Sequence, residues 1–263
     1  MFVFLRLSQI FSVAIGFEFK GFYMTREEAV KKIIFAMDVK EFSDVQHWAE
    51  LLSPHVGMFK VGKQLYTACG PAAVRMIQKC GGEVFLDLKY HDIPNTVAMA
   101  TLEAANLGVK LCDLHAMGGY EMMSKTMETL DKNFSGCAER PRVLAITVLT
   151  SSNEETLRGI GIDIPVPEMV VKLAKLAQKA GVDGVVASPQ EVGLIREACG
   201  KDFLVVTPGV RPSFASTDDQ KRIMTPADAV KAGADYLVIG RPIAAAESPA
   251  KAAEAIVDEI VAG

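Results

Sequence analysis

Four charged side chains make up the part of the sequence with the clearest potential for chemistry. Asp87, Lys89 and Asp92 lie close together in the run DLKYHD, and Lys60 lies in an earlier apolar run. An apolar stretch, residues 84–86, precedes the DLKYHD run, and a loop that enters a helix follows it. Alternating Lys and Asp residues can form a structural ion-pair network of modest energetic value, or they can act on a substrate. Their position at the end of a buried strand favours action on a substrate.

Two glycine and arginine pairs at later strand ends predict an anion site. Gly209 and Arg211 follow one apolar run, and Gly240 and Arg241 follow another. Glycine lets backbone amides approach an anion, arginine adds positive charge, and barrel enzymes often bind phosphate after their seventh and eighth strands. Either pair alone is commonly a turn with a solvated arginine. Together the pairs predict a phosphorylated substrate.

Other polar residues near strand ends have a structural alternative. Asp38 ends the first predicted strand and Thr150 follows the fifth, so each is a candidate for the site and also for a helix cap. His91 and His115 are expected to make structural hydrogen bonds, and no spacing of histidines and carboxylates indicates a metal. We therefore predict that the site uses no metal.

The elements that must position these residues are repeated β-α units. Short apolar runs alternate with longer amphipathic stretches from residue 33 onward. The candidate strands, about eight in number, are Ile33–Met37, Met58–Val61, Val84–Leu88, Leu111–His115, Val143–Val148, Gly184–Ala187, Phe203–Thr207 and Tyr236–Ile239. Such a repeat predicts an α/β fold, a closed (β/α)8 TIM barrel with its catalytic groups at the C-terminal ends of the strands. A doubly wound open sheet is the alternative.

Helices are predicted where apolar residues recur three and four positions apart. The clearest are Asp44–Leu52, Pro71–Lys79, Thr96–Asn106, Met169–Lys179 and Pro249–Val261. Thr25 and Glu28 have the spacing of a capping box, and Ser248 is a candidate cap. No linker rich in Pro, Ser or Gly divides residues 24–263, so we expect a single catalytic domain there.

Residues 1–23 are apolar and aromatic and need a separate interpretation. Arg6, Ser8 and Gln9 interrupt the apolar run that a membrane span needs. Neither the basic start nor the small-residue cleavage site of a signal peptide is clear. We expect an N-terminal extension, either an artefact of an upstream start or a poorly anchored segment.

Composition indicates an ordinary globular protein. With 263 residues, of which 50% are hydrophobic, the chain can bury a sizeable core. A net charge of -4 without a basic stripe argues against nucleic-acid binding. Five cysteines without a C-x-x-C pair are expected to be reduced thiols in a cytoplasmic protein.

The run DLKYHDIPNT, residues 87–96, resembles the signature of the orotidine 5'-monophosphate decarboxylase family. Further motifs before and after this run occur in the order and spacing of that family. They are FAMD ending at Asp38, FKVG with Lys60, VLTS with Thr150, TPGVRP with Arg211 and IGRP with Arg241. The resemblance covers nearly the whole predicted barrel and leaves only the N-terminal extension outside.

The resemblance implies removal of CO2 from C6 of orotidine 5'-monophosphate to give UMP, the last step of de novo pyrimidine nucleotide biosynthesis, without any cofactor. By similarity, Lys89 donates the proton and stabilises charge at C6, Asp87 lies near the substrate carboxylate, and Lys60 and Asp92 complete the charge row. The other implied substrate contacts are Asp38 and Lys60 at the ribose, Thr150 at the pyrimidine, Arg211, Gln220, Gly240 and Arg241 at the phosphate or its closing loop, and Pro208.

The resemblance also implies a partner. In this family the aspartate that corresponds to Asp92 reaches into the neighbouring subunit's site together with Ile93 and Thr96, so a homodimer is expected. Residues 212–225 are polar and rich in Ser, Thr and Asp, as expected of a mobile lid over the phosphate.

Two other functions remain as alternatives. A magnesium-dependent sugar-phosphate barrel enzyme, such as a hexulose-phosphate synthase or keto-gulonate-phosphate decarboxylase, shares a D-x-K-x-x-D core. The context of His91, Thr150 and Gln220 resembles the nucleotide decarboxylase instead. A non-catalytic barrel that binds a phosphate ligand is the second alternative, and the intact Lys and Asp row argues against it.

Overall fold

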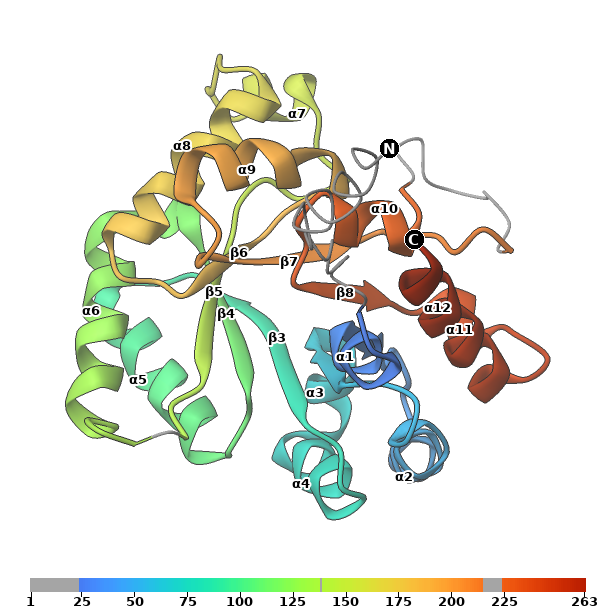
Figure 1. The fold of residues 1–263 in the computed structure, drawn as a ribbon. Coiled ribbons are helices and arrows are strands. Elements are labelled where there is room, and N and C mark those ends of the chain that lie inside the picture. The colour runs from blue at the N-terminus through green and yellow to red at the C-terminus, as the bar shows by residue number, and fades with distance from the viewer. Residues whose placement is uncertain (1–23, 138, 215–223) are drawn as a thin grey trace, which may run out of the picture.

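The structure, a computed structural model, describes residues 24–137, 139–214 and 224–263 and contains a closed barrel of parallel strands (Figure 1). The strands follow one another around the barrel in chain order, and β1 pairs with β8 to close it. Their bounds are β1 Ile33–Ala36, β2 Met58–Gly62, β3 Val84–Tyr90, β4 Leu111–His115, β5 Arg142–Ile146, β6 Gly184–Val186, β7 Leu204–Pro208 and β8 Tyr236–Ile239. The predicted (β/α)8 barrel is confirmed, and the open doubly wound sheet is wrong.

Helices surround the barrel, as Figure 1 shows. They are α1 Arg26–Lys32, α2 Phe42–Leu52, α3 Lys63–Cys69, α4 Pro71–Lys79, α5 Pro94–Asn106, α6 Gly119–Asn133, α7 Glu154–Gly159, α8 Val166–Lys179, α9 Val192–Cys199, α10 Pro226–Lys231, α11 Arg241–Ala244 and α12 Pro249–Ala262, with short 3-10 turns η1 Ala116–Gly118 and η2 Pro189–Glu191. Each predicted strand and helix exists, and strand ends differ from the predicted ones by at most two residues.

Helix caps show where local sequence rules hold. Thr25 and Glu28 form the predicted capping box at α1. Ser248 precedes α12, but its side chain makes no capping hydrogen bond, so this prediction is wrong. The ψ of Ser248 is 95° whereas ψ of the capping residue Thr25 is 156°, so the backbone at the start of α12 differs from that of a helix with a side-chain cap.

Two apolar layers hold the fold together. One fills the barrel interior and consists of Ile34, Ala36, Met58, Phe85, Leu111, Leu144, Val206 and Val238. The second and larger layer lies between the strands and the surrounding helices. Because both faces of every strand are covered, the strands read as continuous apolar runs, which explains why they were recognisable in the sequence.

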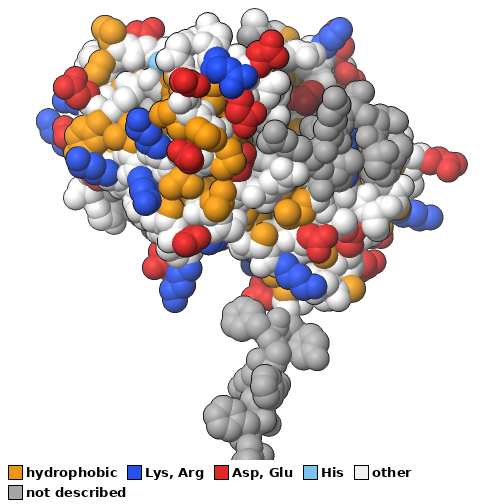
Figure 2. Space-filling view, turned by 90° about the horizontal axis from the view of Figure 1, so that it is seen from above, with side chains coloured by type: hydrophobic (Ala, Val, Ile, Leu, Met, Phe, Trp, Pro, Cys, Tyr) orange, Lys and Arg blue, Asp and Glu red, His pale blue; other side chains and the backbone are white. Residues whose placement is uncertain are grey.

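The chemistry of the surface agrees with the composition. All five cysteines are free thiols, as predicted. Within the described ranges, no helix is both long and apolar enough to cross a membrane. On the face shown in Figure 2, the described Lys and Arg side chains are interspersed with Asp and Glu and do not gather into a basic stripe.

Candidate active site

Strand periodicity places the predicted charges inside the barrel. Side chains alternate between the two faces of a strand, so a residue two positions beyond an interior residue also points inward. Lys60 lies two positions after the interior residue Met58, and Asp87 lies two positions after Phe85. Both steps run toward the C-terminal end of the strand. The charged side chains therefore lie on the C-terminal side of the apolar layer that fills the barrel interior, which we call the apolar plug.

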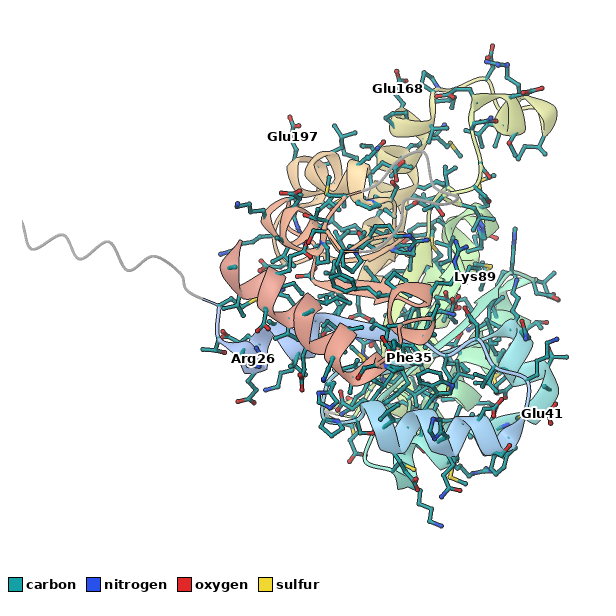
Figure 3. The ribbon with its side chains drawn as sticks, turned by 90° about the vertical axis from the view of Figure 1, so that its right-hand side faces the viewer. Arg26, Phe35, Glu41, Lys89, Glu168 and Glu197 are labelled. Carbon is teal, nitrogen blue, oxygen red and sulfur yellow. The ribbon has the colours of Figure 1, made fainter. Side chains whose placement is uncertain are left out.

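A cavity of about 210 Å³ opens above this plug. Its walls are Lys60, Phe85, Asp87, Lys89, Asp113, Ile146, Val148, Leu149, Thr150, Val186, Ala187, Pro208 and Val238, which come from β2 through β8 and the segments that follow them. In Figure 3, Lys89 lies on the side of the molecule away from Arg26, which belongs to the helix that precedes β1. The cavity is thus at the C-terminal mouth, where barrel enzymes place their active sites.

Three of the four predicted charges form a continuous row in this cavity. Lys60 Nζ lies 3.3 Å from Asp38 Oδ1 and 3.5 Å from Asp87 Oδ2. Lys89 Nζ is paired with Asp87 Oδ1 on the other side. The side chains of Lys60 and Asp87 are each only 12% exposed, so solvent screens their interaction little, whereas the Asp38 side chain is 64% exposed. The row runs Asp38, Lys60, Asp87, Lys89.

The backbone of Lys89 has an unusual conformation. Its φ is 53°, and among the described residues it is the sole non-glycine residue with a positive φ. The pairing register between β3 and β4 shifts between Leu86 and Tyr90, which marks a bulge at this point. A bulge redirects a side chain, and a left-handed residue other than glycine costs on the order of 1–2 kcal/mol. Such a cost at the mouth of a barrel is typical of a functional position.

One residue of the site was missed in the sequence. Asp113 lies in the middle of β4, two positions after the interior residue Leu111, and its side chain is fully buried. Its Oδ1 accepts a hydrogen bond of 2.7 Å from the backbone N–H of Lys89, and its Oδ2 lies 3.9 Å from Lys89 Nζ. The sequence did contain a signal that could have identified Asp113 as a site candidate, because it is a charged residue inside the predicted strand LCDLH, which is otherwise mainly apolar.

The two neighbouring carboxyl groups titrate in opposite directions. Burial, and then the charge of Asp87, raise the pKa of Asp113 well above its ordinary value. Burial also acts to raise the pKa of Asp87, but the hydrogen bond from Asp113 and the charges of Lys60 and Lys89 together lower it. Two carboxylates this close cannot both ionise easily, so a proton binds more readily to Asp113 than to Asp87.

The remaining residues of the DLKYHDIPNT run face outward. Asp92, Ile93 and Thr96 are exposed, and Ile93 is 67% exposed. Asp92 Oδ1 accepts a hydrogen bond of 2.6 Å from the backbone N–H of Ile93. Within the described part of this single chain, Asp92 makes no ion pair with Lys60 or Lys89. Within this single chain the structure therefore does not place Asp92 in the row.

The cap interpretations of Asp38 and Thr150 are wrong. The residue before α2 is Glu41, and Asn153 caps α7 with its side chain. Asp38 instead pairs with Lys60, and Thr150 lines the cavity together with Pro208. Both residues are thus free of a helix-capping role and available to the site.

The described residues include part of the predicted anion site, namely Gly209, Arg211, Gly240 and Arg241. Gly209 has a φ of 81°, a conformation that glycine adopts without strain. A Cβ on Gly240 would lie 3.2 Å from Ala36 Cβ, so a larger residue there would press on β1. Arg241 is the first residue of α11, and the Arg211 backbone N–H donates to the Met224 carbonyl at 3.1 Å. Gln220 and most of the predicted lid lie outside the described residues.

The predicted structural hydrogen bond is confirmed for His115, whereas His91 contacts it through a ring stack. The rings of His91 and His115 stack with centroids 5.4 Å apart, and His115 Nδ1 accepts from the Met117 backbone N–H at 3.4 Å. Burial, followed by the nearby His91 and Lys89, lowers the pKa of His115 to about 4. In the described ranges no group of three or more His, Cys, Asp and Glu residues is arranged to hold a metal. That the site uses no metal stays a prediction.

Comparisons with known proteins agree with this geometry. Residues 31–256 match the family model described as "Orotidine 5'-phosphate decarboxylase / HUMPS family". A protein of Citrifermentans bemidjiense named orotidine 5'-phosphate decarboxylase is 91% identical over 240 residues, covering 91% of this chain and 100% of that protein. A protein of Geobacter sulfurreducens with the same name is 72% identical over 240 residues, with the same coverage of 91% and 100%.

Solved structures show the same fold. The crystal structure of orotidine 5'-phosphate decarboxylase from Lactobacillus acidophilus is 36% identical in sequence, covers 87% of this chain and 98% of its own, and superposes with a TM-score of 0.76. The family model covers most of the chain, and the curated relatives are matched over their full length. The chain belongs to the orotidine 5'-phosphate decarboxylase / HUMPS family.

Proposed function

We propose that the protein removes CO2 from orotidine 5'-monophosphate to give UMP, in pyrimidine biosynthesis. The observation that carries this proposal is the row of Lys60, Asp87 and Lys89 at the barrel mouth. The 91% identity to a protein named for this reaction supports it. A cytoplasmic location accords with this role in nucleotide synthesis.

The chemical problem is a carbanion. When the bond between C6 and the carboxylate breaks, the electron pair stays on a ring carbon with little delocalisation while CO2 leaves as a neutral molecule. The enzyme must stabilise this charge and protonate C6. The Lys89 ammonium supplies both functions: it faces the developing charge, and then Nζ gives its proton to C6 and regains one from solvent.

The neighbours of Lys89 hold its side chain in position. The pKa of Asp87 is lowered, and its carboxylate is paired with Lys89 Nζ. Lys60 in turn stabilises the charge of Asp87 from the other side. With substrate bound, Asp87 would face the departing carboxylate, and the repulsion between the two anions ends when CO2 forms.

Binding of the remote parts of the substrate supplies the energy for orientation. Asp38 and Lys60 would bind the ribose hydroxyls, and Thr150 and Pro208 would contact the pyrimidine side of the cavity. The phosphate would bind at Arg211, Gln220, Gly240 and Arg241, after β7 and β8. Such contacts far from C6 can be used to close the site over the reacting carbon.

The active form would be a homodimer in which Asp92 of each chain completes the site of the other. The exposure of Asp92, Ile93 and Thr96 beside the site entrance supports this proposal. Mixing Lys89→Ala and Asp92→Ala proteins, followed by subunit exchange, tests it. Each mixed dimer would contain one intact site, so activity should return to roughly a quarter of that of the unmutated protein. A mixture as inactive as its components would contradict the shared site.

Residues 24–263 would form one catalytic domain, with residues 1–23 as an extension that takes no part in the reaction. A chain that begins at Met24 should therefore turn over orotidine 5'-monophosphate at the rate of the whole chain. A large loss of turnover on removal of residues 1–23 would contradict this division.

The experiment that tests the reaction itself is a spectroscopic assay. Purified protein is mixed with orotidine 5'-monophosphate in the presence of EDTA, and loss of the substrate's ultraviolet absorbance is followed. Rapid conversion to UMP is expected. Absence of conversion, together with magnesium-dependent turnover of a hexulose or gulonate phosphate, would favour the sugar-phosphate alternative. Binding of UMP without turnover of either substrate would favour the non-catalytic barrel.

A further inference from the structure

Asp113 is a buried ionisable residue beside Lys89 that the proposed reaction does not use. It lies at the floor of the cavity, and its side chain is fully buried. Buried carboxyl groups normally have every oxygen paired. Here Oδ1 accepts from the Lys89 backbone, whereas Oδ2 has no hydrogen-bond partner if the group is an ionised acceptor. An unsatisfied buried oxygen next to the reacting lysine requires an explanation.

The position of Oδ2 suggests that it carries a proton. Lys89 Nζ is paired with Asp87 Oδ1 and lies 3.9 Å from Asp113 Oδ2, so the two carboxyl groups are close neighbours, and an ionised pair in a buried site would be strongly repulsive. A proton on Oδ2 removes the repulsion and gives Oδ2 a partner. Lys89 Nζ does not satisfy Oδ2, because it lies 3.9 Å away and is already paired with Asp87.

The other oxygen explains the bulge. Lys89 has left the ladder between β3 and β4, so its N–H needs an acceptor other than the β4 backbone. Asp113 Oδ1 provides that acceptor at 2.7 Å. The strained φ of 53° at Lys89 is thus held by a hydrogen bond to a fully buried side chain of β4.

We propose that Asp113 is a positioning residue for the decarboxylation: Oδ1 holds the Lys89 backbone in the bulge, and Oδ2–H donates a hydrogen bond that keeps Asp87 ionised and aligned. Asp113 itself exchanges no proton with substrate. The proposal rests on the proposed function, since its effect is measured relative to the turnover of orotidine 5'-monophosphate by the unmutated protein. If that protein were inactive, the proposed function would fail first and separately.

Two substitutions separate the proposed role from simple packing. In Asp113→Asn, the amide oxygen can accept from Lys89 N–H and the amide NH2 can donate to Asp87, so kcat should stay within about threefold. In Asp113→Ala both bonds are lost, and kcat should fall about 10- to 100-fold with a smaller change in KM. Asn and Ala variants that are equally impaired would overturn the neutral-donor role. An unimpaired Ala variant would overturn positioning altogether.

A matched control comes from the opposite end of the barrel. Asp183, which precedes β6, is also a buried carboxylate that accepts a hydrogen bond from a neighbouring strand, in this case from Val143 N–H at 2.8 Å. Asp183→Ala should lower the melting temperature and leave kcat unchanged below the transition. If Asp183→Ala lowered kcat as much as Asp113→Ala does, the effect at Asp113 would be general loss of packing, and the proposal would be overturned.

The dependence of kcat/KM on pH is a measurement that a loss of packing alone would not change. The titratable groups nearest the Asp113 carboxyl are Asp87 and Lys89 on β3; Tyr90 and Cys112 also interact with its charge, although both pack in the layer between strands and helices. Burial raises the pKa of Tyr90 and of Cys112, so neither titrates in acid. Without the Asp113 donor, the pKa of Asp87 should rise, and the acid limb of kcat/KM should move to higher pH in Asp113→Ala but not in Asp113→Asn. An unmoved acid limb in the Ala variant would refute the hydrogen bond to Asp87.

A direct measurement covers the case in which the Ala variant does not fold. Carbon-13 NMR of the unmutated protein with labelled aspartate reports the protonation state of each carboxyl carbon, and the Asp113 signal is assigned by its loss in Asp113→Asn. A protonated carboxyl at neutral pH is expected. An ionised Asp113 carboxylate at neutral pH would overturn the proposal.

Discussion

Replacement of Lys89 by alanine is the most direct test of the site. The substitution removes the ammonium that pairs with Asp87 Oδ1 and leaves the rest of the row in place. Asp87 keeps Lys60 at 3.5 Å, so it does not become an isolated buried charge. Alanine meets the same backbone strain at φ 53° as lysine does. The melting temperature should therefore change by only a few degrees, on the order of 1 kcal/mol.

The effect on turnover should be far larger than the effect on stability. Proton donation by a positioned side chain contributes about 10²- to 10⁴-fold, and a charge aimed at a developing anion contributes about 10²- to 10³-fold. Lys89 would supply both in one transition state, so the two contributions do not add fully. We expect kcat to fall at least about 10⁴-fold, which corresponds to about 5 kcal/mol of transition-state stabilisation.

Two control variants show which property of Lys89 matters. Lys89→Arg keeps a positive charge, but a guanidinium does not release its proton at neutral pH, so substrate binding should survive while turnover is lost. Lys110→Ala removes an exposed lysine that pairs with Glu83 at 3.5 Å, at the N-terminal end of β4, and should leave turnover unchanged. Conversion of orotidine 5'-monophosphate is followed by absorbance. A Lys89→Ala protein within tenfold of the unmutated rate would refute the assignment of Lys89 as proton donor.

Three further predictions concern the phosphate, the barrel floor and pH. Arg241→Ala should raise KM for orotidine 5'-monophosphate about 10- to 100-fold by removing a charged phosphate contact, and steady-state kinetics showing an unchanged KM would exclude this contact. Asp183→Ala should lower the free energy of unfolding by about 3–5 kcal/mol, because Arg140 loses its partner at 2.7 Å; an unaltered urea midpoint would contradict this. Burial and then Asp87 raise the pKa of Asp113, so the folded chain keeps a proton that the unfolded chain releases, and stability should fall as pH rises above the unfolded pKa. The free energy of unfolding should therefore fall by up to about 1.4 kcal/mol per pH unit in the unmutated protein. Asp113→Asn should remove this pH dependence, as urea titrations at several pH values would show.

The barrel could be predicted because its strands are covered on both faces. Each strand reads as an apolar run, and each run ends at a residue with a polar or turn-forming side chain. The strand that contains Asp87 and Lys89 was predicted to end at Leu88, whereas β3 continues to Tyr90. The error has a physical origin: charged residues usually mark a strand end, but here they lie within the strand and point into the mouth of the barrel.

The part of the site that could not be predicted depends on tertiary contacts. Asp113 comes from β4, and neither its contact with the Lys89 backbone nor the bulge at Lys89 leaves a local pattern in the sequence. The predicted cap at α12 was also wrong, because the residue type of Ser248 does not fix the backbone angles that a cap needs. Sequence patterns report which residues are apolar or charged, but the pairing register decides which of them meet.

The same structural device occurs at both ends of this barrel with different consequences. Asp183 and Asp235 each accept a backbone N–H from the strand that pairs with their own, and each also pairs with an arginine, at 2.7 Å for Arg140 and 2.5 Å for Arg196. These carboxyl groups at the N-terminal ends of β6 and β8 thus have both a backbone donor and an arginine partner, as expected of groups that stabilise the fold. Asp113 accepts a neighbouring backbone N–H in the same way, but no arginine is paired with it among the described residues. Without that cation, a buried carboxyl is most stable when neutral, and a neutral acid can donate to Asp87. A buried carboxyl that accepts a neighbouring N–H therefore stabilises the fold at the N-terminal ends of the strands, where an arginine is present. At the C-terminal mouth, where Asp113 has no arginine partner in the described ranges, the same arrangement can position Asp87 and Lys89.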